Sequence, residues 1–282
     1  MENSRPPVRN VSDTSHWVAY FRARETVRPD ALFRDPFAER LARQRGFRIA
    51  ETLPDGNRHE WAWVARTYLF DQFISQQVQQ GAELVLNLAA GLDARPYRMI
   101  LRKAIQWVEV DFPEVIDYKE CQLKDEKALC QLERFALDLS DATVRRSLLS
   151  SLNARGKRIL VVTEGLLIYL EPDVVAELAL DLGAHSHFQA WVIDLTSPGQ
   201  LQLMQRSTGR VLGQVGAAFK FGPKEGVDFF VPYGWKSNEK RGLLKTAADL
   251  NRAPKELLTL LPEPRVISGN YPWAGVCLLE RS

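Results

Sequence analysis

The chain has 282 residues, of which 45% are hydrophobic, and its formal net charge is +2 because 37 Lys and Arg nearly balance 35 Asp and Glu. These values are typical of a globular protein with a sizeable core and argue against disorder. The sequence contains no basic run and no apolar run of the ~18–20 residues that span a bilayer. We therefore expect no nucleic-acid partner, no membrane anchor and a cytoplasmic location.

The first 80 residues carry helical signals. Apolar residues recur with a helical period along residues 59–80, which predicts one long helix that ends before a glycine. Residues 12–46 predict shorter helical segments, with Ser12 or Asp13 as a possible N-cap. We expect residues 1–80 to form an N-terminal helical cap.

Strand and helix signals alternate from residue 81 to residue 196. The pattern predicts strands at 83–88, 105–111, 134–140, within 157–170 and at 188–196, and helices from about 95, at 113–132, 141–156 and 172–183. Such alternation favours a parallel sheet with helices on both faces. In a sheet of this kind, ligands bind at the carboxyl ends of the strands.

The last third of the chain is less regular. Residues 197–231 mix helical signals with glycine-rich turns, and we interpret them as an insertion or lid. Residues 264–282 predict two strands separated by the segment GNYP, consistent with an antiparallel hairpin at a sheet edge. The sequence thus predicts one domain, with a cofactor-binding core at 81–196 and an insertion followed by C-terminal strands at 197–282.

Small residues occupy the turn after the first predicted parallel strand, in the sequence LVLNLAAGLDARPYR. Ala89, Ala90 and Gly91 would allow a nucleoside to approach the backbone closely. Asp111 ends the next strand about 20 residues after Gly91, the spacing at which an acidic side chain accepts hydrogen bonds from ribose hydroxyls. These two features together predict a nucleoside site.

The same turn argues against a dinucleotide. It lacks the further glycines whose backbone amides bind a pyrophosphate. Asp93 is expected to add a negative charge at the mouth of the turn, which disfavours any polyphosphate. A cofactor with a ribose and a cationic centre is therefore the better interpretation.

Cysteines and histidines indicate neither a metal site nor a nucleophile. The three cysteines have no CxxC spacing, and we interpret them as reduced structural thiols. His185 and His187 would point to opposite faces of a strand. The GxSxG, P-loop and HExxH patterns are absent from the sequence, so hydrolase and nucleoside-triphosphatase templates are not favoured, and we expect no metal.

Five ordered segments closely resemble the leucine carboxyl methyltransferase family of S-adenosylmethionine-dependent enzymes, including its bacterial branch of O-methyltransferases. They are RTYLFDQFI, LVLNLAAGLDARPYR, VEVDFPEVIDYK, ALDLS and TEGLLIYL. The segments DTSHWVAYFRARE and FRDPFAERLA resemble the family's N-terminal helices. The resemblance implies an α/β, Rossmann-like class I methyltransferase fold: a mostly parallel seven-stranded sheet with an antiparallel edge hairpin and an N-terminal helical cap.

The resemblance also implies that S-adenosyl-L-methionine is the cofactor and S-adenosyl-L-homocysteine the product. From the match between this sequence and the family's motifs, we expect ten residues to contact the cofactor. They are Arg24, Arg66, Asn87, Ala89, Gly91, Asp111, Phe112, Asp138, Leu139 and Glu164.

Four of these residues have roles implied by the family. Arg66 is similar to the arginine that binds the methionine carboxylate, a task suited to a guanidinium. Asp138 and Leu139 are similar to the pair that flanks the adenine. Glu164 is similar to the residue that contacts the amino end of the cofactor.

Other positions match the family less closely. Arg24 corresponds to a second basic contact from the N-terminal helices, and Arg22 is an equal candidate for it. Tyr169 could line the acceptor pocket or belong to the core. The family usually has glycine at the position of Ala89, and we expect the extra methyl group to reduce cofactor affinity without abolishing binding.

These expectations point to O-methylation of a carboxylate or hydroxyl on a small molecule or peptide. Because a carboxylate is already ionised at neutral pH and the sequence shows no assured base, a carboxylate or an acidic hydroxyl is favoured. The alternatives are a nicotinamide-dependent oxidoreductase, which needs the missing glycines, and a non-catalytic S-adenosylmethionine-binding protein. The catalytic residue, the acceptor and the oligomeric state stay open.

Overall fold

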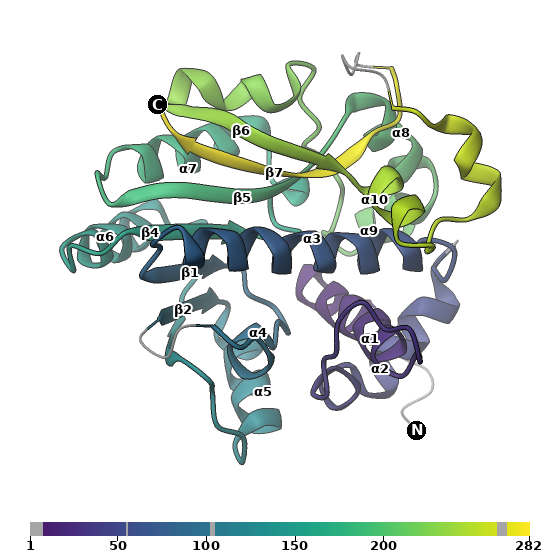
Figure 1. The fold of residues 1–282 in the computed structure, drawn as a ribbon, viewed down its shortest axis with the longest axis horizontal. Coiled ribbons are helices and arrows are strands. Elements are labelled where there is room, and N and C mark those ends of the chain that lie inside the picture. Colours follow the sequence, from purple (N-terminus) through teal and green to yellow (C-terminus); the bar gives the residue numbers. More distant parts are fainter. Residues whose placement is uncertain (1–7, 55, 102–104, 264–269) are drawn as a thin grey trace.

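The computed structural model describes residues 8–54, 56–101, 105–263 and 270–282. The strands are β1 (Leu84–Leu88), β2 (Gln106–Asp111), β3 (Gln131–Ala136), β4 (Ile159–Thr163), β5 (Phe188–Thr196), β6 (Trp235–Gly242) and β7 (Ala274–Arg281). They form one seven-stranded sheet in the order β3-β2-β1-β4-β5-β7-β6 (Figure 1). The strands from β3 to β5 are parallel, whereas β7 is antiparallel to both β5 and β6. The predicted fold class, a mostly parallel sheet with an antiparallel edge, is confirmed.

Helices cover both faces of the sheet. On one face lie α3 (Glu60–Gln79) and α10 (Leu243–Asp249), and on the other α6 (Ala142–Asn153), α7 (Pro172–Gly183) and η3 (Gly226–Tyr233). Side chains of β1 alternate between these two cores: Leu84 and Leu86 pack toward α6 and α7, and Val85 packs toward α3. Because both faces are covered at the centre of the sheet, every residue of β1 and β4 is buried and most of them are apolar.

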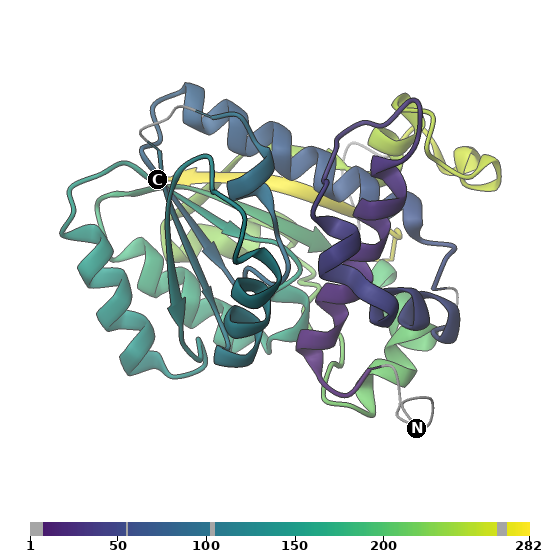
Figure 2. The same cartoon turned by 90° about the horizontal axis from the view of Figure 1, so that it is seen from below.

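A third group of helices lies at the end of the sheet toward which the parallel strands run (Figure 2). It consists of η1 (Val11–Asp13), α1 (Thr14–Thr26), α2 (Ala38–Thr52), α8 (Pro198–Arg206) and α9 (Thr208–Gly213). One apolar cluster joins Phe21 of α1, Ile49 of α2, Leu201 of α8 and Leu212 of α9. The segment interpreted as an insertion or lid therefore packs against the N-terminal helices.

The remaining helices connect strands. α4 (Arg95–Arg98) follows β1 and α5 (Pro113–Leu123) follows β2. The 3-10 helices η2 (Leu167–Tyr169) and η4 (Lys255–Leu260) follow β4 and α10. No helix in the described part of the chain is long and apolar enough to cross a membrane.

Several predicted boundaries were wrong. The helix expected at 113–132 ends at Leu123, because Gln131 pairs with Gln106 and begins β3 earlier than predicted. The helix expected at 141–156 is α6, which ends at Asn153; its N-cap is Asp141, whose carboxylate accepts hydrogen bonds from the backbone N–H groups of Thr143 and Val144. The long helix expected in residues 59–80 is present as α3. It was expected to belong to the N-terminal helical cap, whereas in the structure it packs along one face of the sheet (Figure 1).

The C-terminal hairpin has a different first strand from the one predicted. The antiparallel partner of β7 is β6, which the sequence did not reveal. Its sequence, WKSNEKRG, is dominated by charged and polar residues, as expected for an exposed edge strand that avoids pairing with other chains. Residues 264–269, where the other strand was predicted, lie outside the described residues.

Candidate active site

A cavity of about 670 Å³ lies at the carboxyl ends of the parallel strands. Its walls come from α1, the N-terminal half of α3, the segments that follow β1 to β5, and the helices α8 and α10. A pocket of this size at this place in an α/β sheet is typical of a binding site for a small ligand. Of the predicted site residues, Arg66, Asn87, Ala89, Gly91, Asp111, Phe112, Asp138, Leu139 and Glu164 all line it.

The turn after β1 is held against the end of β2. The Ala90 N–H donates to the carbonyl of Val110 at 3.1 Å, and the Gly91 N–H donates to Oδ2 of Asp111 at 2.6 Å. Both Ala89 and Gly91 have positive φ angles, of 54° and 49°. A Cβ atom on Gly91 would lie 3.2 Å from Cβ of Ser15 on α1. Small residues are thus required here by backbone conformation and by the close approach of α1.

Ala89 is strained because a side chain in the left-handed region costs about 1–2 kcal/mol. We expect Ala89→Gly to raise the free energy of unfolding by about 1 kcal/mol, as measured by urea denaturation. Ala90→Gly is the matched control. Ala90 is buried and has no positive φ, so replacing it by glycine removes a buried methyl group without relieving strain and should destabilise the protein by about 1 kcal/mol. A destabilised Ala89→Gly protein would contradict the proposed strain.

Asp111 and Phe112 end β2 at the cavity wall. The two carboxylate oxygens of Asp111 accept backbone hydrogen bonds, Oδ2 from Gly91 at 2.6 Å and Oδ1 from Phe112 at 2.8 Å. Burial raises the pKa of Asp111, and these two N–H groups partly oppose the rise. Each oxygen retains a further lone pair, so the side chain can still accept hydrogen bonds from a ligand in the cavity.

Asp138 and Leu139 follow β3 on the same side of the cavity. The Leu137 N–H donates to the carbonyl of Asp111 at 2.8 Å and ties this segment to the end of β2. Oδ1 of Asp138 accepts the Ser140 N–H at 2.8 Å, and its side chain is exposed, whereas Leu139 is half-buried against the core. An apolar side chain beside a carboxylate suits a planar ring that carries an amino group.

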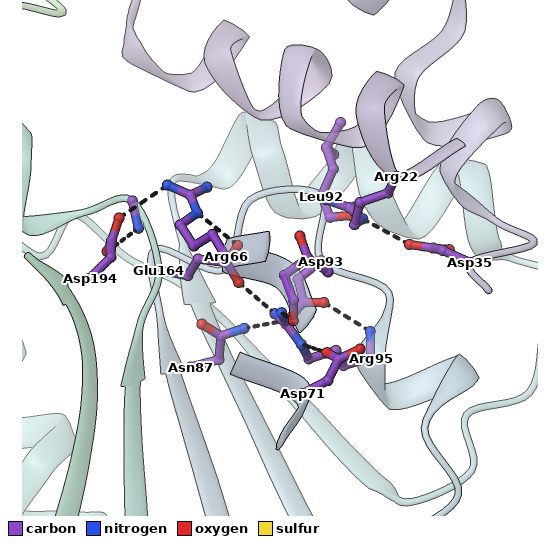
Figure 3. A network of polar contacts seen from close by, with 12 residues as sticks. Arg22, Asp35, Arg66, Asp71, Asn87, Leu92, Asp93, Arg95, Glu164 and Asp194 are labelled. Carbon is purple, nitrogen blue, oxygen red and sulfur yellow. Dashed lines mark hydrogen bonds and ion pairs between the residues drawn. The ribbon is translucent and has the colours of Figure 1, made fainter. Parts of the chain in front are cut away.

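A buried ionic network lies beneath the turn (Figure 3). The guanidinium of Arg95 donates to Asp71 at 2.6 Å, to Glu164 at 2.7 Å and to Asp93 at 3.0 Å. Asn87 donates to Oδ2 of Asp93 at 2.9 Å. Asp93 is therefore neutralised inside the protein, and the prediction of a negative charge at the mouth of the turn is wrong.

The network makes stability depend on pH. Burial alone would raise the pKa of Asp71 and of Asp93, but Arg98 and Arg95 outweigh it at Asp71, and Arg95 and Lys119 outweigh it at Asp93. Both carboxyls therefore have pKa values below the ordinary 3.8. The folded state binds these protons more weakly than the unfolded state, so the stabilisation is complete above about pH 4 and is lost as the pH falls further.

We expect the free energy of unfolding to begin to fall near pH 4 and to keep falling as the pH is lowered further, as measured by urea denaturation at each pH. Asp71→Asn should show a shallower fall, because one of the two carboxyls no longer titrates. The variant and the parent would have equal slopes if Asp71 contributed nothing to this dependence.

Arg66 reaches the cavity from α3. Its Nε donates to Oε1 of Glu164 at 3.2 Å and its Nη1 donates to Oδ2 of Asp194 at 3.0 Å (Figure 3). The guanidinium lies over the Trp63 ring, 4.5 Å from the centroid. Asp194 was not among the residues predicted from the sequence, although a carboxylate near the carboxyl end of the buried strand AWVIDLT was a signal that could have identified it.

Of the two arginines considered for the second basic contact, Arg22 lines the cavity and Arg24 does not. Arg24 does not line the cavity: its guanidinium is half exposed and pairs with Glu60 at 2.8 Å. Residues two positions apart on a helix point to nearly opposite sides. Arg22 therefore lies on the other side of α1, where it lines the cavity and pairs with Asp35 at 2.8 Å. Arg22 also donates to the carbonyl of Leu92 and so joins α1 to the turn (Figure 3).

Other candidate groups are placed as follows. Tyr169 lines the cavity and its ring packs on Phe219, 5.6 Å between centroids. Of the histidines, His59 lines the cavity, and His16 is buried against the backbone of α2, where burial lowers its pKa. Burial raises the pKa of Cys130 to about 12, so this thiol is not a nucleophile near neutral pH. No cluster of metal-ligating side chains occurs in the described ranges.

Comparison with known proteins identifies chains of similar sequence. The family model described as Leucine carboxyl methyltransferase matches residues 15–182. A provisionally named S-adenosyl-L-methionine-dependent methyltransferase of Streptomyces coelicolor is 30% identical over 80% of this chain and 83% of its own length. A relative of the same name from Frankia alni is 33% identical over 61% of this chain and 64% of its own length.

A solved structure supports the fold. A DUF574 family protein from Streptomyces avermitilis superposes with a TM-score of 0.60 at 10% sequence identity, covering 94% of this chain and 97% of that protein. At this identity the likeness concerns the fold alone.

Proposed function

This chain belongs to the leucine carboxyl methyltransferase family of S-adenosylmethionine-dependent methyltransferases, and from this premise we propose that it methylates an oxygen atom, a carboxylate or a hydroxyl, of a small molecule or peptide. The observation that carries the proposal is one continuous cavity that joins Asp111, Arg66 and Glu164 to a largely apolar region. Such a cavity has groups for a charged, ribose-bearing cofactor at one end and room for an acceptor at the other.

The residues at the β1–β2 end of the cavity fit the nucleoside half of the cofactor. We assign Asp111 to the ribose hydroxyls, because its oxygens lie at the cavity wall with lone pairs to spare. Asp138 and Leu139 are assigned to the adenine, with the carboxylate toward its amino group and the leucine on its face. Gly91 provides the close backbone approach, and Phe112 adds an apolar wall.

The residues at the β4–β5 end fit the methionine half. The Nη2 group of Arg66 has no hydrogen-bond partner among the described residues and is available to a carboxylate. Glu164 carries a negative charge suited to an ammonium group, and two arginines already hold it in place. The pairing of a cation with a carboxylate at this end matches the zwitterion of an amino acid.

When bound, S-adenosylmethionine supplies a methyl group activated by its sulfonium charge. The protein is then required to align the acceptor oxygen and to exclude water, and a strong base is not compulsory for an acceptor that is already ionised. Only His59 among the histidines of the described residues lines the cavity. This supports a carboxylate or an acidic hydroxyl as the acceptor group.

The acceptor end lies beside β5 and β7 and is mostly apolar. Its walls include Leu203, Met204, Phe219, Phe221, Leu260 and Trp273. Apolar walls stabilise a ligand whose body is aliphatic or aromatic and penalise one that buries unpaired polar groups. We therefore infer an acceptor with a largely apolar body.

Two measurements test the proposal. Calorimetric titration should show binding of S-adenosylmethionine and no binding of NADH; the reverse would indicate the nicotinamide-dependent oxidoreductase instead. Incubation with a labelled methyl donor and a panel of apolar carboxylic acids and phenols should then yield labelled products. Base releases the label from methyl esters and leaves it on methyl ethers, which distinguishes the two acceptor groups. Binding without transfer to any acceptor would indicate a non-catalytic binding protein.

A further inference from the structure

Asp194, near the carboxyl end of β5, connects two parts of the cavity wall. Its Oδ1 accepts the Gly165 N–H at 2.8 Å, and its Oδ2 accepts Nη1 of Arg66 at 3.0 Å. The side chain is 16% exposed and lines the cavity. One carboxylate thus holds both the loop after β4 and the guanidinium that reaches the cavity from α3.

The guanidinium of Arg66 is confined on several sides. The Trp63 ring lies 4.5 Å away, and Glu164 takes the Nε hydrogen. Gly165 has a φ of 69°, and a Cβ atom on it would lie 3.2 Å from Nη1 and 3.4 Å from Nη2 of Arg66. The loop therefore needs glycine at this position both for its backbone conformation and because the guanidinium packs against it.

These contacts occupy two of the three guanidinium nitrogens and leave the third. Glu164 takes Nε, Asp194 takes Nη1, and Nη2 makes no hydrogen bond within the described residues. An arginine side chain is otherwise free to rotate about several bonds, and ordering it costs side-chain entropy. Anchors inside the protein cover that cost before a ligand arrives.

We propose that Asp194 is a positioning residue that fixes the guanidinium of Arg66 so that its Nη2 edge receives the carboxylate of the cofactor's methionine portion. This inference rests on the proposed assignment of Arg66 to that carboxylate. It differs from a role for Asp194 as a competitor, in which its negative charge would repel the incoming carboxylate and weaken binding.

The test compares two ligands in calorimetric titrations of the full chain. S-adenosylhomocysteine carries the carboxylate, whereas 5′-methylthioadenosine has the same nucleoside and lacks the amino-acid portion. We expect Asp194→Ala to weaken S-adenosylhomocysteine binding by about tenfold or more, the effect of losing one charge-assisted anchor, and to change 5′-methylthioadenosine binding by less than about twofold.

Three further variants sharpen the comparison. Asp194→Asn keeps the size of the side chain and guards against loss of folding, and it should give a smaller but still selective effect. In an Arg66→Ala background, Asp194→Ala should have no additional effect on S-adenosylhomocysteine, because the residue acts through Arg66. Asp173→Ala, an exposed position on α7, is the control and should bind both ligands as the parent does.

Different results would overturn different claims. Equal weakening of both ligands would show a merely structural role for Asp194, and unchanged or tighter binding of S-adenosylhomocysteine would show that it does not position Arg66. If the parent protein bound neither ligand, the proposed function itself would fail. Weakening confined to S-adenosylhomocysteine supports the inference.

Discussion

Replacement of Arg95 by alanine is expected to lower the free energy of unfolding by about 3–5 kcal/mol, the usual cost of breaking a buried ion pair by removing one partner. Arg95 is 2% exposed and donates hydrogen bonds to the carboxylates of Asp71, Asp93 and Glu164. Its removal would leave these negative charges close together with less compensation in a region of low dielectric.

Urea denaturation near neutral pH measures this effect. Arg155→Ala provides the matched control, because Arg155 also pairs with a carboxylate, Glu133, but both side chains are substantially exposed. An exposed pair contributes about 0–1 kcal/mol, so the control should unfold almost as the parent does. If both variants lost equally little stability, the network around Arg95 would not hold the turn and the end of β4 together.

Replacement of Asp111 by alanine is expected to weaken binding of S-adenosylmethionine by about 1–3 kcal/mol, or roughly 5- to 150-fold. The variant loses the proposed acceptor of the ribose hydroxyls. It also loses the bond from the Gly91 N–H, which fixes the turn against the end of β2. Both losses act on the same half of the cavity, so the effect should be large.

Isothermal titration of the two proteins with S-adenosylmethionine gives the comparison. Asp117→Ala removes a carboxylate of the same size from an exposed position on α5, six residues further along the chain, and should leave the dissociation constant unchanged. An unaltered dissociation constant for Asp111→Ala would remove this residue from the cofactor site.

Part of the proposed cofactor end of the cavity was predictable, because a nucleoside site needs particular residue types within short segments. A turn of small residues after one strand and an acid at the end of the next are both visible in the chain, and in the structure Gly91 and Asp111 are hydrogen-bonded to each other. The parallel pairing of β1 to β5 could also be anticipated, since strand and helix signals alternate along this part of the chain. The sequence and the structure agree here because each of these features lies within one short segment of the chain.

Tertiary pairing explains what the sequence did not reveal. Asp93 reads as an exposed charge until Arg95 is seen to neutralise it, and Arg22 is distinguished from Arg24 only by the side of α1 that faces the turn. Asp194 is recognised by its partners, Arg66 and Gly165, which are far away in the chain. Likewise β6 has no apolar alternation and is defined by its pairing with β7.

The two ends of the cavity are built from different kinds of segment. The ionic groups around Arg95 and Arg66 join α3 to the ends of β1, β4 and β5, so a change to one of them disturbs several others. The walls near the acceptor, such as Met204 of α8 and Leu260 of η4, are separate apolar side chains on connecting helices. Exchange of these few side chains would therefore alter which molecule fits the proposed acceptor end, while the ionic groups at the proposed cofactor end would keep their partners.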